Sequence, residues 1–252
     1  MKALGVHFGI SLLIAALVAV LVFVFWFPYP YRTLAGGQHL FWLIVGIDVV
    51  CGPLLTAVLF NPTKSPRELT LDLSIVGVLQ IAALLYGVHA LALARPVRLA
   101  YEVDRFVVVS EAQIDQEVLG RVSSEFQTLP WDGPVLVGTR APRDSDETLR
   151  SIDLSAQGME PSARPDWWQS YDRSRPQVLK RMKAAVDLRA QLKTHQQDAL
   201  DRAIKETGLP ISQISYLPLV SRDRLDDWVV LLDKNAAVIG YASVDGFGQA
   251  AR

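Results

Sequence analysis

The first 94 residues carry very little charge, and this constrains the fold more than any other feature of the sequence. They contain seven of the chain's 51 Asp, Glu, Lys and Arg residues. Three apolar segments lie within them, at residues 5–27, 39–60 and 71–94. At ~1.5 Å of rise per helical residue, each is long enough to cross the ~30 Å hydrocarbon core of a lipid bilayer. We therefore expect three transmembrane helices.

This division predicts two domains. Residues 1–96 should form a membrane domain, and residues 97–252 a soluble domain of ordinary composition. A cleaved signal peptide is the alternative for the first segment, but its apolar core should be only about 7–15 residues long. The first segment is longer and ends among Trp26, Phe27 and Tyr29, which is typical of a membrane–water interface. We therefore expect it to be a retained helix.

Basic residues in the connecting segments predict the orientation. Lys2 precedes the first span, Lys64 and Arg67 lie between the second and the third, and Arg32 alone lies between the first two. The positive-inside rule then places the N-terminus in the cytoplasm. Because three spans carry the chain across the membrane, the C-terminal domain should lie in the periplasm of a bacterial cell, with the helices in the inner membrane.

The soluble part alternates between strand-like and helix-like patterns. Residues 153–176 are rich in Pro, Ser, Asp and Arg and should form a loop. The other expected elements are strands at 99–109, 135–137, 213–220, 228–233 and 237–244, and helices at 111–121, 177–193 and 196–207. This order predicts an α+β domain with a mainly antiparallel sheet and helices on one face.

No recognised catalytic motif occurs in the soluble part. It has no phosphate-binding glycine loop, no HExxH and no cysteine, since Cys51 lies in an apolar segment. His195 is its one histidine, although a Ser–His–Asp triad is defined by geometry and needs no local motif. A formal net charge of −1 gives no reason to expect a nucleic-acid partner. We expect a non-enzymatic protein without cofactor or metal.

The most informative polar residue is Asp48, near the middle of the second apolar segment. A charge at that depth costs about 2.5–3.5 kcal/mol even on the insertion scale with the lowest values. Gln80 should lie at a similar depth, with Ser11 of the first segment nearby, and Gly52 and Pro53 follow Asp48 closely. Two interpretations remain: the polar groups hold the three helices together, or they bind a partner helix.

Several short motifs carry a family resemblance. They are Gly5-Val6-His7-Phe8, Trp26-Phe27-Pro28-Tyr29-Pro30, Gly46-Ile47-Asp48-Val49-Val50-Cys51-Gly52-Pro53-Leu54-Leu55-Thr56, Asp72-Leu73 with Gln80 and Tyr86-Gly87, and Val103-Asp104-Arg105-Phe106. The first 110 residues thereby resemble the TfpX/TfpZ-type accessory proteins of type IV pilins. The resemblance implies an inner-membrane protein that works with the major pilin in the assembly of type IV pili.

Together, the residues and the resemblance give a hypothesis about the partner. Asp48, Gln80, Ser11, Gly52 and Pro53 would bind the transmembrane helix of the major pilin, and the soluble domain would contact its periplasmic head. The alternative is a membrane-anchored sensor whose periplasmic domain binds a small ligand. Such a sensor needs an output module, and the expected cytoplasmic segments are short.

Overall fold

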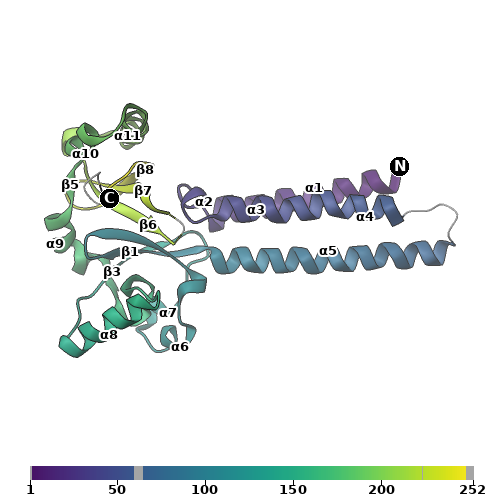
Figure 1. Cartoon of the computed structure of the whole chain (residues 1–252), viewed down its shortest axis with the longest axis horizontal. Coiled ribbons are helices and arrows are strands. Elements are labelled where there is room, and N and C mark those ends of the chain that lie inside the picture. The colour runs from purple at the N-terminus through teal and green to yellow at the C-terminus, as the bar shows by residue number, and fades with distance from the viewer. Residues whose placement is uncertain (1, 60–64, 223, 248–252) are drawn as a thin grey trace. The chain divides into compact units, whose positions relative to one another are not determined.

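The chain divides into two compact units, Met1–Arg95 and Pro96–Arg252. The computed structural model describes residues 2–59, 65–222 and 224–247 (Figure 1). Phe60, the last residue of the second predicted span, and Lys64, used for the predicted orientation, lie outside the described residues. We refer to the first unit as the helical unit and to the second as the sheet unit.

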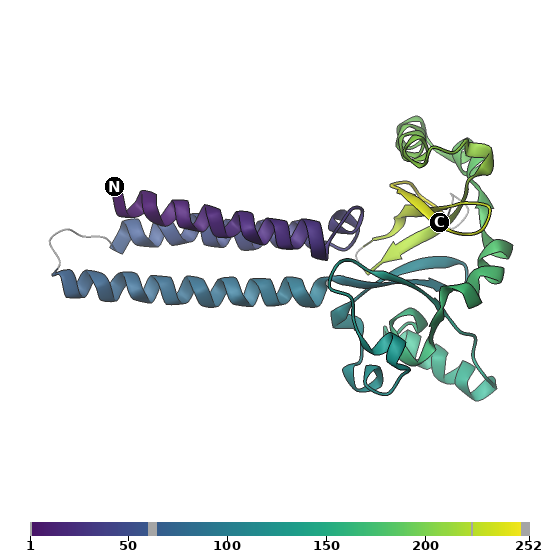
Figure 2. The ribbon, with the colours of Figure 1, turned by 180° about the vertical axis from the view of Figure 1, so that it is seen from behind.

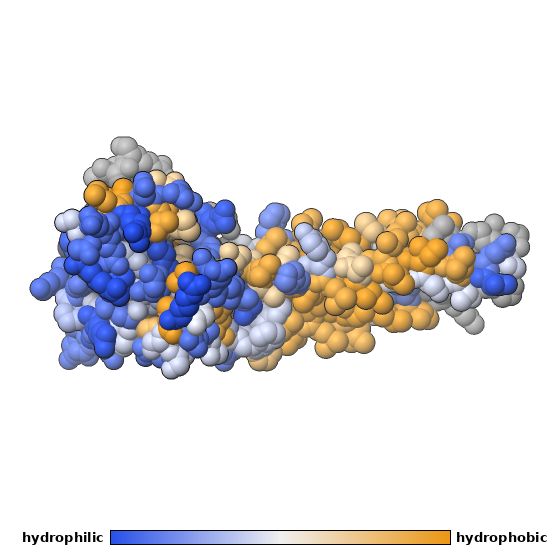
Figure 3. Space-filling model, turned by 90° about the horizontal axis from the view of Figure 1, so that it is seen from below, coloured by the Kyte–Doolittle hydropathy of each residue, from blue (hydrophilic) through white to orange (hydrophobic). Residues whose placement is uncertain are grey.

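Long helices interrupted by π-helical segments make up the helical unit (Figures 1 and 2). In chain order they are α1 (Lys2–Val20) with the π-helical η1 (Leu21–Trp26), the short α2 (Tyr31–Leu34), α3 (Gly37–Gly46) with the π-helical η2 (Ile47–Cys51) and α4 (Gly52–Leu59), and α5 (Pro66–Ala94). Among the described residues, three stretches are long and apolar enough to cross a membrane: Gly5–Trp26, Gly37–Val58 and Arg67–Ala94. Figure 3 shows the largely apolar surface of these helices.

The third helix begins earlier than residue 71, where its predicted span began, because a capping box starts it. Ser65 is the N-cap, and its hydroxyl accepts a hydrogen bond from the Glu68 backbone N–H at 3.3 Å. The Glu68 carboxylate in turn accepts one from the Ser65 N–H at 3.0 Å. This reciprocal pair satisfies two backbone donors that a helix start otherwise leaves free.

One end of the helical unit is tightly packed. Five large apolar side chains there are between 0 and 4% exposed: Val22, Trp26, Phe27, Phe41 and Leu91. They come from η1, α3 and α5 and from the residue that follows η1, so this cluster joins all three long helices. We call it the closed end.

In the part of the sheet unit that the structure describes, one mixed sheet has eight strands. The strands are β1 (Pro96–Glu102), β2 (Arg105–Ser110), β3 (Val135–Thr139), β4 (Trp168–Ser170), β5 (Lys183–Ala184), β6 (Ser215–Ser221), β7 (Arg224–Leu232) and β8 (Val238–Ala242). Their order is β4-β3-β1-β2-β6-β7-β8, with β5 paired to β6.

The prediction of a mainly antiparallel sheet is corrected by this topology. β1 pairs with β3 in parallel, and β2 pairs with β6 in parallel, so parallel pairs lie on both sides of the β1–β2 hairpin. The connection between β1 and β3 runs through residues 103–134, and the connection between β2 and β6 runs through residues 111–214. Each is longer than the dozen residues that a crossover to a parallel strand requires.

Helices fill these connections and the segment before β4. They are η3 (Glu111–Gln113), α6 (Gln116–Leu119), α7 (Ser124–Gln127), α8 (Ser145–Ala156), η4 (Pro161–Ala163), η5 (Pro165–Trp167), α9 (Tyr171–Arg181), α10 (Ala185–Gln191), α11 (Thr194–Thr207) and η6 (Ile211–Gln213). Two clusters of buried apolar residues pack against the sheet, one including α10 and α11 and the other including α6.

Four local predictions were wrong. The expected helix 111–121 is reduced to the 3-10 helix η3 and the four-residue α6, which has its own N-cap at Asp115. The expected strand 99–109 is a hairpin, because Val103 adopts a φ of 58° and turns the chain. The expected loop 153–176 contains the end of α8, β4 and the start of α9. The expected helix 177–193 is divided by β5, which pairs with β6 and so interrupts the helical run. The α11 helix agrees with its prediction within two residues.

Candidate functional site

A groove of about 570 Å³ opens on the helical unit between α1 and α5, with η2 and α4 contributing to its lining. Apolar side chains at its rim are largely exposed, including Val6 at 63% and Ile81 at 61%. The polar side chains Ser11, Asp48 and Thr56 are between 2 and 9% exposed, so they lie at the bottom of the groove. An apolar helical surface thus encloses a polar floor. We call this feature the polar groove.

The structure brings Asp48 and Gln80 together in the polar groove, as their expected depths indicated. The Gln80 Nε2 atom donates to the Asp48 carboxyl Oδ1 at 3.3 Å and to the Asp48 backbone oxygen at 3.2 Å. Ser11 lines the same groove but is not part of this contact. One amide therefore bridges α5 to both the side chain and the backbone of η2.

Pro53 explains why the Asp48 backbone oxygen needs a donor from another helix. Asp48 lies in the π-helical segment η2, where a carbonyl pairs with the N–H five residues later. Five residues after Asp48 is Pro53, which has no N–H. Side chains of neighbouring helices commonly satisfy a carbonyl that proline leaves free inside an apolar bundle. Gln80 has this role here.

Gly52 provides the space for the Gln80 amide. A Cβ atom at Gly52 would overlap the Gln80 side-chain amide group. The sequence hypothesis gave Gly52 a role in binding a partner, whereas its neighbour in the structure is internal. Gly46, by contrast, has no atom within 4 Å of where a Cβ would lie, so its face of the helix is open.

Sequence reasoning missed a second polar pair in the groove. His7 Nδ1 and Thr56 Oγ1 are 2.7 Å apart and join α1 to α4. A signal for it was available, since His7 and Ser11 are four residues apart and Asp48 and Thr56 are eight apart. Both spacings place side chains on one face of a helix.

The floor of the polar groove keeps unused hydrogen-bonding capacity. An ionised carboxyl group offers about four acceptor sites and a protonated one fewer, and among the described residues the Asp48 carboxyl receives one hydrogen bond, from a neutral amide. No cationic side chain in the described ranges forms an ion pair with it. The Ser11 hydroxyl takes part in no hydrogen bond within the same ranges. The groove can therefore still accept polar contacts from outside the unit.

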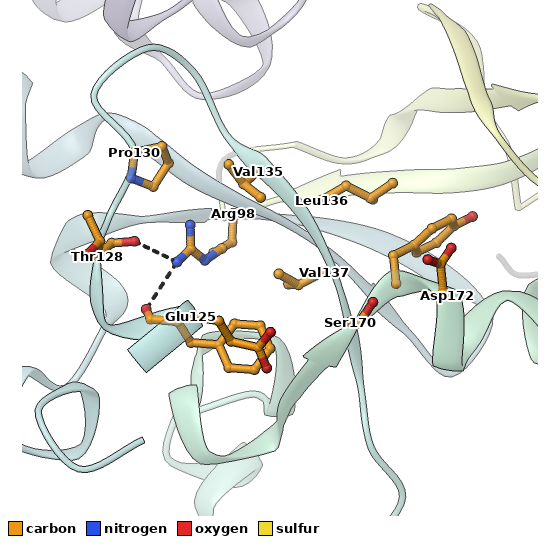
Figure 4. Close-up of a pocket in the computed structure, with 11 residues that line it drawn as sticks. Arg98, Glu125, Thr128, Pro130, Val135, Leu136, Val137, Ser170 and Asp172 are labelled. Carbon is orange, nitrogen blue, oxygen red and sulfur yellow. Dashed lines mark hydrogen bonds between the residues drawn. The ribbon is translucent and has the colours of Figure 1, made fainter. Parts of the chain in front are cut away.

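A second pocket, of about 500 Å³, lies in the sheet unit beside Arg98 (Figure 4). Arg98 is 2% exposed, and burial lowers the pKa of its guanidinium group. Its Nη2 atom donates to the backbone oxygens of Phe126 at 3.1 Å and Thr128 at 2.9 Å. The guanidinium carbon also lies 5.0 Å from the centre of the Trp168 ring, a cation–π contact.

Arg98 has the contacts of a structural clamp. It connects β1 to the end of α7 and the residue after it, where helix carbonyls lack partners in their own helix. Its Nε atom is unpaired among the described residues, but it is fully buried and does not reach the pocket. Glu125 and Asp172 also line the pocket and make it unfavourable for an anion. The pocket therefore ranks below the polar groove as a binding site.

No arrangement in the described ranges suggests a metal centre. No group of three or more His, Cys, Asp and Glu side chains among those residues could hold a metal ion. A short ion pair in the sheet unit joins Arg140 to Glu147 at 2.7 Å. Hydrogen bonds from Arg140 and the Arg143 backbone lower the pKa of the Glu147 carboxyl to about 2. Glu147 follows the N-cap of α8, so this pair fixes a helix start.

Comparison with known proteins gives matches along the whole chain. The family described as "Fimbrial assembly protein FimB" matches residues 1–36. The "Fimbrial assembly protein, serogroup I" of Dichelobacter nodosus is 35% identical over 246 residues, which cover 98% of this chain and 95% of that protein. The "Fimbrial assembly protein, serogroup E1" of the same organism is 34% identical over 246 residues, which again cover 98% of this chain and 95% of that protein. The protein of serogroups C1 and C2 is 45% identical over 113 residues, 45% of this chain and 86% of that protein. No solved structure matches the chain significantly.

Proposed function

This chain belongs to the fimbrial assembly protein family, and from this premise we propose that it is a non-enzymatic accessory factor that binds the major pilin of type IV pili. Its role is to support the stability of the pilin or its assembly into pili. The sequence motifs that resemble TfpX/TfpZ-type accessory proteins point to the same role. We propose that, within the family, the chain is of this TfpX/TfpZ type.

The proposed location is the bacterial inner membrane. The three stretches that are long and apolar enough to cross a membrane support this location. The N-terminus lies in the cytoplasm and the sheet unit in the periplasm, in agreement with Lys64 and Arg67 between the second and third predicted spans and Arg32 alone between the first two. In this orientation the helical unit and the pilin's apolar helix share the bilayer, and the sheet unit and the pilin's head share the periplasm.

The polar groove is the observation that carries the proposal. Burying Asp48 and Ser11 among apolar helices is unfavourable, and ionisable groups within membranes are usually retained for function. The internal contact with Gln80 uses part of the capacity of Asp48, and the exposed rim around it is apolar. An apolar helix with a polar group on one face matches both parts of this surface.

Replacing Asp48 tests the proposal. Asp48→Leu removes the carboxyl, whereas Asp48→Asn keeps an acceptor oxygen and nearly the same shape. We expect Asp48→Leu to reduce co-purification of the pilin about tenfold, equivalent to ~1.4 kcal/mol, and to reduce surface piliation. Asp48→Asn should retain most of both.

The control is Val58→Leu, because Val58 is 78% exposed on the same helical stretch and does not line the groove. It should behave as the unaltered chain does. All variants must be present in the membrane at equal amounts, measured by immunoblot. Unchanged co-purification and unchanged piliation with Asp48→Leu would rule out docking at the groove.

The role of the sheet unit is tested by removing it. Residues 1–96 and the full chain are compared for co-purification of the pilin. If the sheet unit contacts the pilin's head, the shortened chain should retain part of the binding. Equal binding by both would restrict the interaction to the helical unit.

A further inference from the structure

The polar groove also constrains the chemistry of its occupant. We infer that the helix bound there carries a hydrogen-bond donor side chain near the middle of its membrane-spanning segment, opposite Asp48, with apolar side chains on either side. This inference rests on the proposed function, which identifies the bound helix as the transmembrane helix of the pilin. The inference specifies the kind of side chain that the helix must present and the position of that side chain along the helix.

The need for a donor follows from what the floor of the groove leaves unused. The Asp48 carboxyl accepts one hydrogen bond from Gln80 among the described residues and has acceptor sites to spare. A lipid acyl chain offers no donor, so it would leave these sites unsatisfied in an environment without water. Hydroxyl, amide, ammonium and guanidinium groups can all supply the donor. A helix is the form in which a polypeptide brings such a group into a bilayer.

The apolar flanks follow from the rim. Residues 6–14 of α1 and 73–84 of α5 line the groove, which at ~1.5 Å per residue corresponds to ~12 Å and ~16 Å, or two to three helical turns. Ile10 and Ile81 on these walls are 54% and 61% exposed. The groove has a volume of about 570 Å³ and is open along these two walls. The occupant therefore inserts one polar side chain between apolar ones.

The depth of the donor follows from the position of Asp48. Asp48 lies eleven residues after Gly37 and ten before Val58, the ends of its apolar stretch. Gln80 is similarly central, thirteen residues after Arg67 and fourteen before Ala94. A donor that faces both must lie near the middle of its own spanning segment. A polar residue at either end of that segment would not reach the floor.

A double-mutant cycle with the pilin tests the inference. Each polar residue in the spanning segment of the pilin is replaced by leucine, one at a time, and co-purification is measured with the full chain and with its Asp48→Leu variant. One central replacement should reduce co-purification about tenfold with the unaltered chain. The same replacement should cause no further loss with Asp48→Leu, because the contact is already absent.

Two results of the cycle would overturn the inference. In one, no pilin replacement weakens binding. In the other, every replacement weakens binding equally with and without the Asp48 carboxyl. In both, the unaltered pilin still co-purifies, so the proposed function stands. If the unaltered pilin does not co-purify with the unaltered chain, the proposed function itself fails.

Site-specific photo-crosslinking provides a second, independent measurement. A photo-reactive amino acid is placed at Ile81 or at Leu79, which are 61% and 60% exposed on the same helix. Only Ile81 of these two lines the groove. The spanning helix of the pilin should be crosslinked from position 81 and not from position 79. Adducts from position 81 with lipid alone, or with a second copy of this chain, would overturn the inference.

Discussion

Asp48 and Arg98 are both buried ionisable side chains, and neither forms an ion pair among the described residues. They differ in how their polar atoms are used. Arg98 donates to two backbone oxygens of the 126–128 segment and stacks on Trp168, and its remaining unpaired nitrogen is sealed from solvent. The Asp48 carboxyl receives one hydrogen bond and opens into a groove. A buried ionisable side chain alone therefore does not mark a binding site. Unused hydrogen-bonding capacity beside open space is the better indicator.

The largest effect on stability should come from Arg98→Met, which tests whether Arg98 is the structural member of this pair. Removing the guanidinium leaves the Phe126 and Thr128 carbonyls without a donor, at roughly 1–3 kcal/mol each. We expect the free energy of unfolding of the sheet unit to fall by ~3–4 kcal/mol, measured by urea denaturation of the detergent-solubilised chain with tryptophan fluorescence. The control is the exposed Arg150→Met. A loss below ~1 kcal/mol would show that Arg98 is not a clamp.

Gln80→Leu should have a smaller effect, because hydrogen bonds between apolar helices average ~0.6 kcal/mol and reach ~1.7 kcal/mol. Gln80 satisfies two oxygens of Asp48, so we expect a loss of ~1–2 kcal/mol in resistance to unfolding by SDS. In a Pro53→Ala background, residue 53 regains an N–H and the loss should fall to about half. Equal losses in both backgrounds would contradict the role of Gln80 as the partner of the carbonyl that proline leaves free.

Gly52→Ala should have the smallest effect of the three. The added methyl group displaces the Gln80 amide, which lies at the end of a flexible side chain and can move away. We expect a loss of ~1 kcal/mol, the size of one net hydrogen bond, measured by the same SDS unfolding. Gly46→Ala is the matched control, because a Cβ there meets nothing within 4 Å. If neither substitution changes the resistance to SDS, the contact between Gly52 and Gln80 does not contribute to stability.

The sequence predicts those parts of the fold and of the polar groove that a local sequence pattern determines. The contact between Asp48 and Gln80 could be predicted because the depth of a residue in a spanning helix can be counted along the chain. The role of Pro53 was missed because it depends on a π-helical frame, in which the relevant carbonyl is five residues away. His7 and Thr56 were missed because their contact joins two helices that were read separately. The parallel pairs of the sheet were missed because the local pattern of a strand does not identify its neighbour.

The closed end and the polar groove of the helical unit differ in a way that bears on how a partner arrives. The closed end, where Phe27 and Leu91 are 0% exposed, fixes the distances between the three helices. The polar groove has exposed rim side chains on both walls, so it opens sideways. A helix already dissolved in the same bilayer can enter it by lateral diffusion, without threading along the membrane normal. The rate of encounter then depends on the number of partner molecules per unit area of membrane and not on a concentration in the surrounding solution.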